Sequence, residues 1–273
     1  MPLTSRQLAA FAEEFAWRLP VDTSPRHLAG PGDVRHVTHG LAAARWSTVS
    51  DPLSAEIVMR SPDLRHCLQF DPQSHTSAWW RLRAEPIDSE PGWYAEFGEL
   101  VPAEILTGFT DALIAPPPQQ PDLWRPVTSA GWHRDADGTA HSPDSMCHIE
   151  LRPLREFSGR PSWHVETSEP GHGGYPGRRI WHAYFDEHTP THLVAAFLTA
   201  LADPSPIQRN QYDRTAHYSA VQEPSPLRPQ QVVEAHTARI ESLRARARSA
   251  RRQQSRLPAT PAKGYGAPSA TRR

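Results

Sequence analysis

The sequence predicts an α+β protein built from two tandem repeats. Each repeat is expected to be an antiparallel sheet of about four strands followed by one helix, with an additional N-terminal helix and a long basic C-terminal helix. The ungapped stretch 61–72, which begins Ser-Pro-Asp, recurs as 142–153. A Trp-x-Ala-x-Phe stretch followed by Pro, Phe and Leu begins at Trp93 and again at Trp181. Such internal similarity sets the architecture of a chain before local propensities do.

The repeats and the distribution of proline divide the chain into seven segments. The 29 prolines are roughly twice the usual share, and many gather in polar stretches that are typical of linkers and disorder. The predicted segments are 1–45 (N-terminal helix and loop), 46–115 (first repeat), 116–131 (proline-rich linker), 132–205 (second repeat), 206–229 (proline-rich linker), 230–257 (basic helix) and 258–273 (disordered tail).

Residues 4–18 are predicted to form an amphipathic helix. Apolar residues from Leu8 to Phe15 recur at spacings of three and four, and a Thr-Ser pair at the start can cap the helix. The stretch 22–45 is predicted to be a loop followed by a short helix near Leu41–Ala44.

Apolar and polar residues alternate within each repeat. The alternation holds for Trp80 and Leu82 and for 93–97, and it recurs at 163–165 and 181–185. A period of two means that one face of the sheet is buried and the other is solvated. The Ser-Pro-Asp tripeptides are expected to reverse the chain, because proline presets φ and Ser and Asp accept local backbone hydrogen bonds.

Each repeat is predicted to end in a helix. Thr189 is expected to cap the second of these helices, with Pro190 at the first helical position. The first helix follows Pro102 and lacks the capping hydroxyl. Gly108 and Ala196 occupy equivalent positions, and their small size indicates a close approach of each helix to its sheet.

The basic helix, 230–257, carries apolar residues near a seven-residue repeat that His236 and Gln254 interrupt. We expect this narrow stripe to dock on the body or to form a weak coiled coil. Residues 239–273 contain ten Lys and Arg and one acid, a net +9. The whole chain has a net charge of −1, so residues 1–238 carry −10. An acidic body with a basic tail is typical of an interaction tail.

The repeated motifs resemble a known family. The doubled Ser-Pro-Asp turn and the Trp-x-Ala-x-Phe ending are similar to an actinobacterial domain named for its Ser-Pro-Asp-Tyr motif and catalogued as domain of unknown function 317. Segment 25–33 resembles members of that family as well. The resemblance covers about residues 24–205 and implies two copies. Leu64 and Ser145 stand where the family has tyrosine. The resemblance implies no activity, cofactor or catalytic residue.

Composition excludes several classes of protein. No apolar run approaches the roughly 20 residues that cross a bilayer, and the N-terminus lacks the apolar core of a signal peptide. We therefore expect no membrane partner and a cytoplasmic location. The two cysteines, Cys67 and Cys147, do not make a disulfide scaffold. They are not equivalent between the repeats, which favours buried structural thiols over nucleophiles.

Catalytic and metal-binding signals are weak. His36 and His39, with His27 and Asp33 nearby, are residue types that ligate zinc. A His-x-x-His pair alone is a poor predictor, and loop histidines bonded to backbone explain it equally. The chain lacks a Gly-x-Ser-x-Gly motif, a phosphate-binding glycine-rich loop and a metalloprotease helix. We predict no enzymatic activity, no metal and no cofactor.

Tryptophan is abundant, with nine residues. Six of them form pairs across the repeats, which favours core packing: Trp46 and Trp132, Trp80 and Trp163, Trp93 and Trp181. Trp79 is expected to point away from the core. With Arg81 and Arg83 it would offer a platform on which bases stack. The alternative is that Trp79 is buried between the repeats.

Arginine density in the basic helix is the strongest chemical signal, because clustered arginines attract phosphates through counterion release. These residues are Arg244, Arg246, Arg248, Arg251, Arg252 and Arg256. The leading hypothesis is a non-enzymatic protein that associates with nucleic acid through this helix and tail, assisted by the Trp79 platform. The competing hypothesis is a protein–protein adaptor or homo-oligomer without a nucleic-acid role. A solvated helix lying on the acidic body would also explain the arginines.

Overall fold

The computed structural model describes residues 3–88, 90–118, 122–152 and 161–254. The N-terminal part contains α1 (Ser5–Phe15), β1 (Pro20–Ser24) and the short helix η1 (Arg26–Leu28). The first repeat contains α2 (Arg35–Ala43), β2 (Ser47–Thr48), β3 (Ile57–Arg60), β4 (His66–Phe70), β5 (Ala78–Ala84), β6 (Trp93–Gly98) and α3 (Ala103–Ala112). The second contains α4 (Arg125–Ser129), β7 (His133–Arg134), β8 (Ala140–His141), β9 (Cys147–Arg152), β10 (Ser162–Ser168), β11 (Arg179–Phe185) and α5 (Thr191–Ala202). The chain continues through β12 (Ile207–Asn210), β13 (Val221–Pro224) and α6 (Pro229–Gln254).

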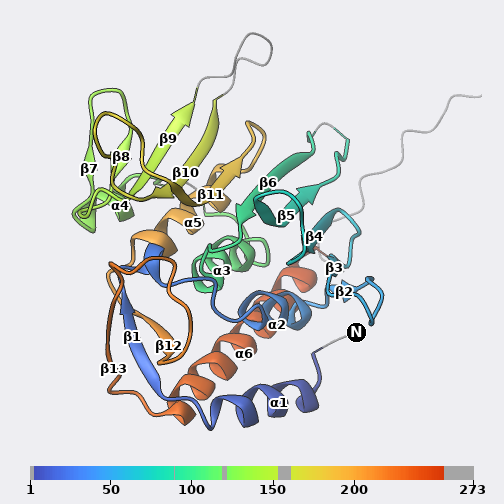
Figure 1. Cartoon of the computed structure of the whole chain (residues 1–273). Coiled ribbons are helices and arrows are strands. Elements are labelled where there is room, and N and C mark those ends of the chain that lie inside the picture. Colours follow the sequence, from blue (N-terminus) through green and yellow to red (C-terminus); the bar gives the residue numbers. More distant parts are fainter. Residues whose placement is uncertain (1–2, 89, 119–121, 153–160, 255–273) are drawn as a thin grey trace, which may run out of the picture.

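The two repeats share one sheet of ten antiparallel strands, in the order β2-β3-β4-β5-β6-β11-β10-β9-β8-β7. Figure 1 shows the helices on one side of this sheet. The repeats join where β6 pairs with β11, with Ala95 opposite Phe185 and Phe97 opposite Ala183. The two pairs are reciprocal, because Ala95 is equivalent to Ala183 and Phe97 to Phe185, so a pseudo-two-fold axis relates the repeats. The prediction of one sheet per repeat is wrong, because the β6–β11 pairing joins the strands of both repeats into one sheet. Among the described residues each repeat supplies five strands, where about four were predicted. Pairing of the two facing edges gives hydrogen-bond partners to backbone N–H and C=O groups that would otherwise have none in the sheet.

Each repeat also begins with a helix, α2 or α4. Arg45 ends α2 with φ 71 and Gly131 ends α4 with φ 80, and each precedes a buried tryptophan, Trp46 or Trp132. The backbone N–H of each tryptophan donates to the carbonyl oxygen of the residue five positions earlier in the chain. This hydrogen bond is typical of a Schellman motif at the C-terminus of a helix. The structural unit thus extends upstream of residues 46 and 132.

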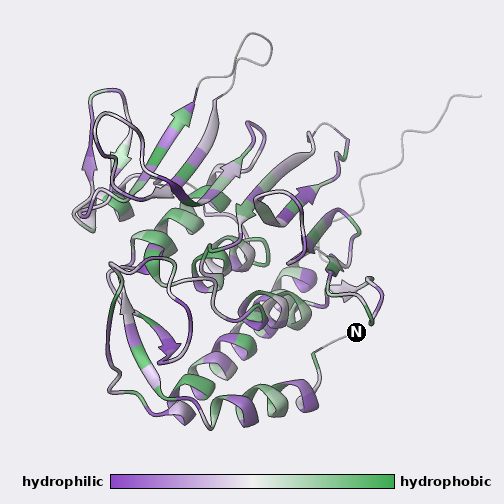
Figure 2. Ribbon diagram, viewed as in Figure 1, coloured by the Kyte–Doolittle hydropathy of each residue, from purple (hydrophilic) through white to green (hydrophobic). Residues whose placement is uncertain are grey.

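The core lies between the sheet and the helices α3 and α5. Four buried phenylalanines meet at the pseudo-two-fold axis, with ring centroids 5.3–5.5 Å apart in the contacting pairs. They are Phe97, Phe109, Phe185 and Phe197. Ring pairs at this separation add stabilisation beyond the area that they bury. Figure 2 shows the two helices coloured mainly as hydrophobic.

Gly108 lies where α3 packs against α5. A Cβ at this position would come 2.6 Å from the Ala196 carbonyl oxygen and 2.6 Å from the Cβ of Ala200. The small residues were predicted to bring each helix close to its sheet. They instead bring the two helices close to each other, across the junction of the repeats.

Five of the six tryptophans that form pairs across the repeats are buried in the core, as predicted. The exception is Trp163, which is half-buried and packs against Trp124 at a ring separation of 5.4 Å.

Residues 206–229, predicted to be a proline-rich linker, are largely structured. They supply β12 and β13, which pair on either side of β1 in a second, three-stranded sheet. Arg209 of β12 is 4 % exposed and donates to both carboxylate oxygens of Glu104, at 2.6 and 2.9 Å. The linker 116–131 likewise contains α4, with Val127 buried. Short strands of four residues carry too little periodicity to be recognised among prolines.

The start of α5 differs from the prediction. Pro190, with ψ 127, is the N-cap residue, so the helix begins at Thr191. The Thr189 hydroxyl does not cap the helix. It donates to the Tyr94 carbonyl oxygen at 3.2 Å and to the Asp186 carboxylate at 2.8 Å. Thr189 therefore connects α5 to β6 of the other repeat.

The N-terminal helix is confirmed as α1, with a capping box at its start. The basic helix is confirmed as α6 over its described residues, and it docks on α1 and α2. Its buried stripe is His236, Ile240, Leu243 and Ala247. His236 was predicted to interrupt this stripe but lies within it. No helix among the described residues has the length and apolar character of a membrane span. The predicted disordered tail, 258–273, lies outside those residues.

Candidate functional site

The basic surface predicted from sequence is built on the C-terminal half of α6. The docked stripe uses other positions, so the arginines project from the flanks and the outer side of the helix. Arg246, Arg248 and Arg252 are exposed, and none of the carboxylates in the described part of the chain pairs with them. Three cations thus face solvent on a rigidly docked helix.

The remaining arginines of the predicted site have mixed roles. Arg244 is half-buried and donates to the Leu3 carbonyl oxygen at 2.9 Å, which holds α6 against the start of α1. Arg251 donates to the Ala247 carbonyl oxygen within α6. Arg256 lies outside the described residues.

The predicted platform on the sheet is a separate surface. Alternation along β5 buries Trp80 and turns Arg81 and Arg83 to the opposite face. Trp79 follows this alternation but also packs against the hydrophobic core, so it is directed away from the core only in part. Its ring is half-buried against the edge of Phe70. All helices lie on the other side of the sheet (Figure 1). The fold therefore does not place the platform and the α6 arginines on one face.

Of the histidines considered for zinc, His27 lies apart at the second Ser-Pro-Asp turn, whereas His36 and His39 both approach His236, at ring separations of 5.2 and 5.4 Å. His39 and His236 contact each other, with Nδ1 and Nε2 3.2 Å apart, and His236 stacks on Phe11 at 4.2 Å. His36 lies 3.5 Å from Glu104. Within the described ranges, no three side chains of ligand type are arranged to hold a metal ion. Burial lowers the pKa of His39 to about 4 and that of His236 to about 3, so both are neutral when folded at neutral pH.

The Ser-Pro-Asp tripeptides form the same turn in both repeats. In the second repeat, the Ser142 hydroxyl donates to Asp144, and the first repeat has the equivalent bond. Leu64 has φ 63 and Ser145 has φ 58. The residues that replace tyrosine therefore stand at a left-handed position, where their backbone completes the turn. The two aspartates are turn residues, as their spacing predicts.

The second turn has an additional partner. His27 Nε2 lies 2.9 Å from Asp144 Oδ2, and the Trp181 indole donates to the His27 carbonyl oxygen at 2.7 Å. Burial alone would raise the pKa of Asp144, but hydrogen bonds from His27 and Ser142 outweigh it and hold the pKa at about 2. Sequence reasoning gave His27 no structural role.

Divergence between the repeats explains this contact. In the first repeat, His66 lies between Trp46 and Trp93, at ring separations of 6.2 and 5.8 Å. The residue equivalent to His66 in the second repeat is Cys147. There His27 lies beside Trp132, the equivalent of Trp46, at a ring separation of 6.4 Å. Burial raises the pKa of the Cys147 thiol, which agrees with a structural cysteine.

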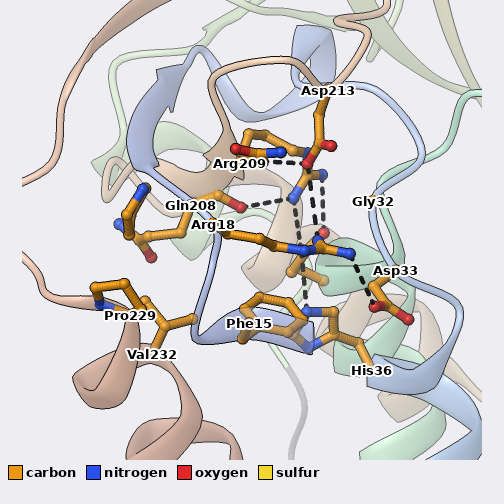
Figure 3. Close-up of a pocket in the computed structure, with 13 residues that line it drawn as sticks. Phe15, Arg18, Gly32, Asp33, His36, Gln208, Arg209, Asp213, Pro229 and Val232 are labelled. Atoms are coloured by element: carbon orange, nitrogen blue, oxygen red, sulfur yellow. Dashed lines mark hydrogen bonds and ion pairs between the residues drawn. The ribbon is translucent and has the colours of Figure 1, made fainter. Parts of the chain in front are cut away.

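A small cavity lies between the end of α1 and β12 (Figure 3). Apolar side chains such as Phe15 and Val232 line it together with ion pairs. Arg18 approaches Asp33 and Asp213 at 3.9 and 4.0 Å, and Arg209 pairs with Glu104. The free volume is about 20 Å³, which suffices for about one water molecule. The cluster fastens the three-stranded sheet to the repeats and has no room for a ligand.

A larger groove of about 870 Å³ runs along α3 and α5, above Gly108 and Ala196. Its charged side chains are already paired with one another: Arg239 donates to Asp111, and Arg26 lies 3.4 Å from Asp203. The groove thus offers space without unpaired polar groups to select a ligand.

Comparison with known proteins finds a family model that matches two segments of the chain. No curated protein and no solved structure matches the chain. Two segments, 60–119 and 141–207, match the family model described as SPDY, a domain of unknown function (DUF317), which is consistent with two copies of that domain in this chain.

Proposed function

We propose that the protein is a non-enzymatic nucleic-acid-binding protein and that the exposed arginines of α6 contact the phosphates. The observation that carries the proposal is that Arg246, Arg248 and Arg252 are exposed and form no ion pair among the described residues. If α6 were only a charged helix lying on the acidic body, its exposed cations would pair with carboxylates of the body, for example those of α1. Instead, the helix docks through its apolar stripe and through Arg239, which donates to Asp111.

The charge distribution favours contact through α6 and not through the body. Residues 1–238 carry a net −10, which repels a polyanion at distances up to about the Debye length, ~8–10 Å in physiological salt. Each phosphate neutralised by an arginine releases counterions, so the affinity should fall steeply with salt. This salt dependence separates phosphate contact from other modes of association.

The test compares the whole chain with the variant Arg246→Gln/Arg248→Gln/Arg252→Gln. Truncation before α6 is unsuitable, because it would expose the core residues that Ile240 and Leu243 cover. Fluorescence anisotropy of labelled single- and double-stranded oligonucleotides is measured over a range of salt concentrations. The expected result is binding by the parent chain and a log–log salt slope that the variant reduces by about 2 to 3.

A matched control removes the same charge elsewhere. Arg125, Arg178 and Arg179 are exposed arginines of the second repeat, and their change to glutamine should leave the slope unchanged. The proposal is refuted if the parent chain binds neither oligonucleotide at low salt, or if both triple variants weaken binding equally.

A second candidate function, a protein–protein adaptor, is favoured by an exposed apolar patch. Trp17 is 88 % exposed, Leu19 57 % and Tyr212 80 %. The Gln211 N–H donates to the Leu19 carbonyl oxygen at 3.1 Å, so the segments that carry these side chains adjoin at one end of the small sheet. Exposed aromatic clusters are typical of interaction surfaces. Light scattering tests self-association: a mass that rises with concentration and returns to the monomer value in Trp17→Ser/Tyr212→Ser would support it.

A further inference from the structure

We propose that the α6 surface continues around the edge of the ten-stranded sheet through Arg45, Arg60 and Arg83, and that a single strand of nucleic acid follows this path onto the outer face. The proposal rests on the proposed function and names its partner more narrowly. The path joins the two surfaces, the α6 arginines and the sheet platform, that the fold places on different sides of the molecule.

Strand register places two of these arginines in one row on the outer face. Arg60 of β3 is opposite Ser47 on one side and Cys67 on the other, and Cys67 is opposite Arg83. Met59 is buried in the core and Arg60 is exposed, so the row belongs to the face without helices. With neighbouring strands about 4.8 Å apart, Arg60 and Arg83 are separated by about 10 Å.

Arg45 links this row to α6. It stands two residues before Ser47, within about 7 Å along the chain, at the end of α2. The helix α2 packs against α6, where a Cβ on Gly40 would lie 3.3 Å from Leu243 Cδ1. The arginine-rich half of α6 begins directly after Leu243. The cations therefore continue from α6 over the end of α2 to the sheet edge.

The backbone at Arg45 supplies an independent observation. Its φ of 71 is left-handed, a conformation that glycine adopts without steric cost and that a side chain with a Cβ disfavours. The equivalent residue of the second repeat is Gly131, with φ 80. Glycine at this position would complete the same helix ending without this cost, so Arg45→Gly removes the guanidinium and keeps the backbone conformation.

The three side chains are available for binding. Arg45, Arg60 and Arg83 are all exposed, and within the described ranges neither Arg45 nor Arg60 pairs with a carboxylate. Arg83 Nε lies 3.7 Å from Glu85, with both side chains more than half exposed, and such a pair contributes little. The path is therefore positive, although the body carries a net negative charge.

The shape of the path selects a single strand. Duplex DNA is stiff, and bending it by 40–90° over 20–30 base pairs costs about 1–6 kcal/mol, which a path around the edge of one sheet would have to supply. Single strands bend freely and gain affinity from stacking on aromatic rings. Tyr94 is the next residue in the row after Arg83, and Trp79 lies on the same face, so the path ends at rings on which bases can stack.

The test uses Arg45→Gly, alone and combined with Arg60→Gln and Arg83→Gln. The probes are a labelled oligothymidylate of about 30 nucleotides and a duplex of equal length, since known sites span about 4–16 nucleotides per domain. The triple variant should reduce the salt slope for the single strand by about 2 and leave the slope for the duplex unchanged. Arg45→Gly alone should weaken single-strand binding while raising the thermal midpoint, so lost folding cannot explain lost binding.

The outcomes separate this path from the proposed function. An unchanged single-strand slope in the triple variant, together with a reduced slope in the α6 variant, overturns the path and leaves the proposed function standing. Equal losses for single strand and duplex also overturn the path. Absence of binding by the parent chain at low salt overturns both.

Discussion

Replacing Gly108 by alanine tests the close contact between the repeats. In most helices this change stabilises by about 1 kcal/mol, because alanine is the better helix former. Here the new Cβ would lie 2.6 Å from the Ala196 carbonyl oxygen and 2.6 Å from Ala200 Cβ. Both atoms belong to or adjoin the backbone of α5, so the helices must separate. Overpacking of this kind costs about 1–3 kcal/mol. After the gain in helix propensity is subtracted, we expect a net loss of up to about 2 kcal/mol in the free energy of unfolding.

The matched control is Gly40→Ala in α2. Its Cβ would meet Arg239 Nη2 at 3.0 Å and Leu243 Cδ1 at 3.3 Å, both at the ends of flexible side chains. The gain in helix propensity should therefore survive, and the control should be neutral or more stable by up to about 1 kcal/mol. Chemical denaturation of the three chains measures the difference through the midpoint at constant m value. Equal stability of Gly108→Ala and Gly40→Ala would refute the inferred packing of α3 on α5.

Three further predictions follow from buried groups. Arg209→Met should cost about 3–5 kcal/mol, because it leaves the Glu104 carboxylate buried without its partner; the added change Glu104→Gln should recover part of this loss in denaturation experiments. The pKa values of His39 and His236 are lowered from 6.5 to about 4 and about 3, so the unfolded chain binds more protons below pH 6.5. Stability should be full above that pH and fall as the pH drops toward 4, by about 2 kcal/mol per histidine at pH 5, and a flat profile between pH 7 and 5 would contradict it. Cys147 is fully buried with a raised pKa, so a thiol reagent should modify only one of the two cysteines before denaturation.

Much of the fold could be predicted from local pattern. The alternation in β5 and β6, the apolar spacing in α1 and the turn chemistry of Ser-Pro-Asp act over a few residues and are legible without tertiary contacts. The prolines of 206–229 led to the prediction of a linker. The segment instead supplies β12 and β13, because edge strands tolerate proline and these two are too short to show a period. His236 misled because a buried neutral histidine packs as an aromatic ring, here on Phe11.

Part of the candidate site could likewise be predicted from the sequence, and part could not. Charge counting found the arginines of α6, because their density is a property of composition. It did not separate Arg244, which anchors α6 to the Leu3 carbonyl oxygen, from Arg248, which is exposed. Arg45 and Arg60 gave no signal, because each is a single arginine whose importance depends on strand register and on the left-handed end of α2.

The sequence by itself determined that the protein consists of a doubled unit with an acidic body and a basic C-terminal helix, because repetition, periodicity and charge are written along the chain. Only the tertiary structure decided that the two units share one sheet through β6 and β11 and that α6 belongs to the folded body. These choices depend on which open edges and apolar faces meet in space, and equivalent residues such as Gly108 and Ala196 acquire their role only when the two copies pack together.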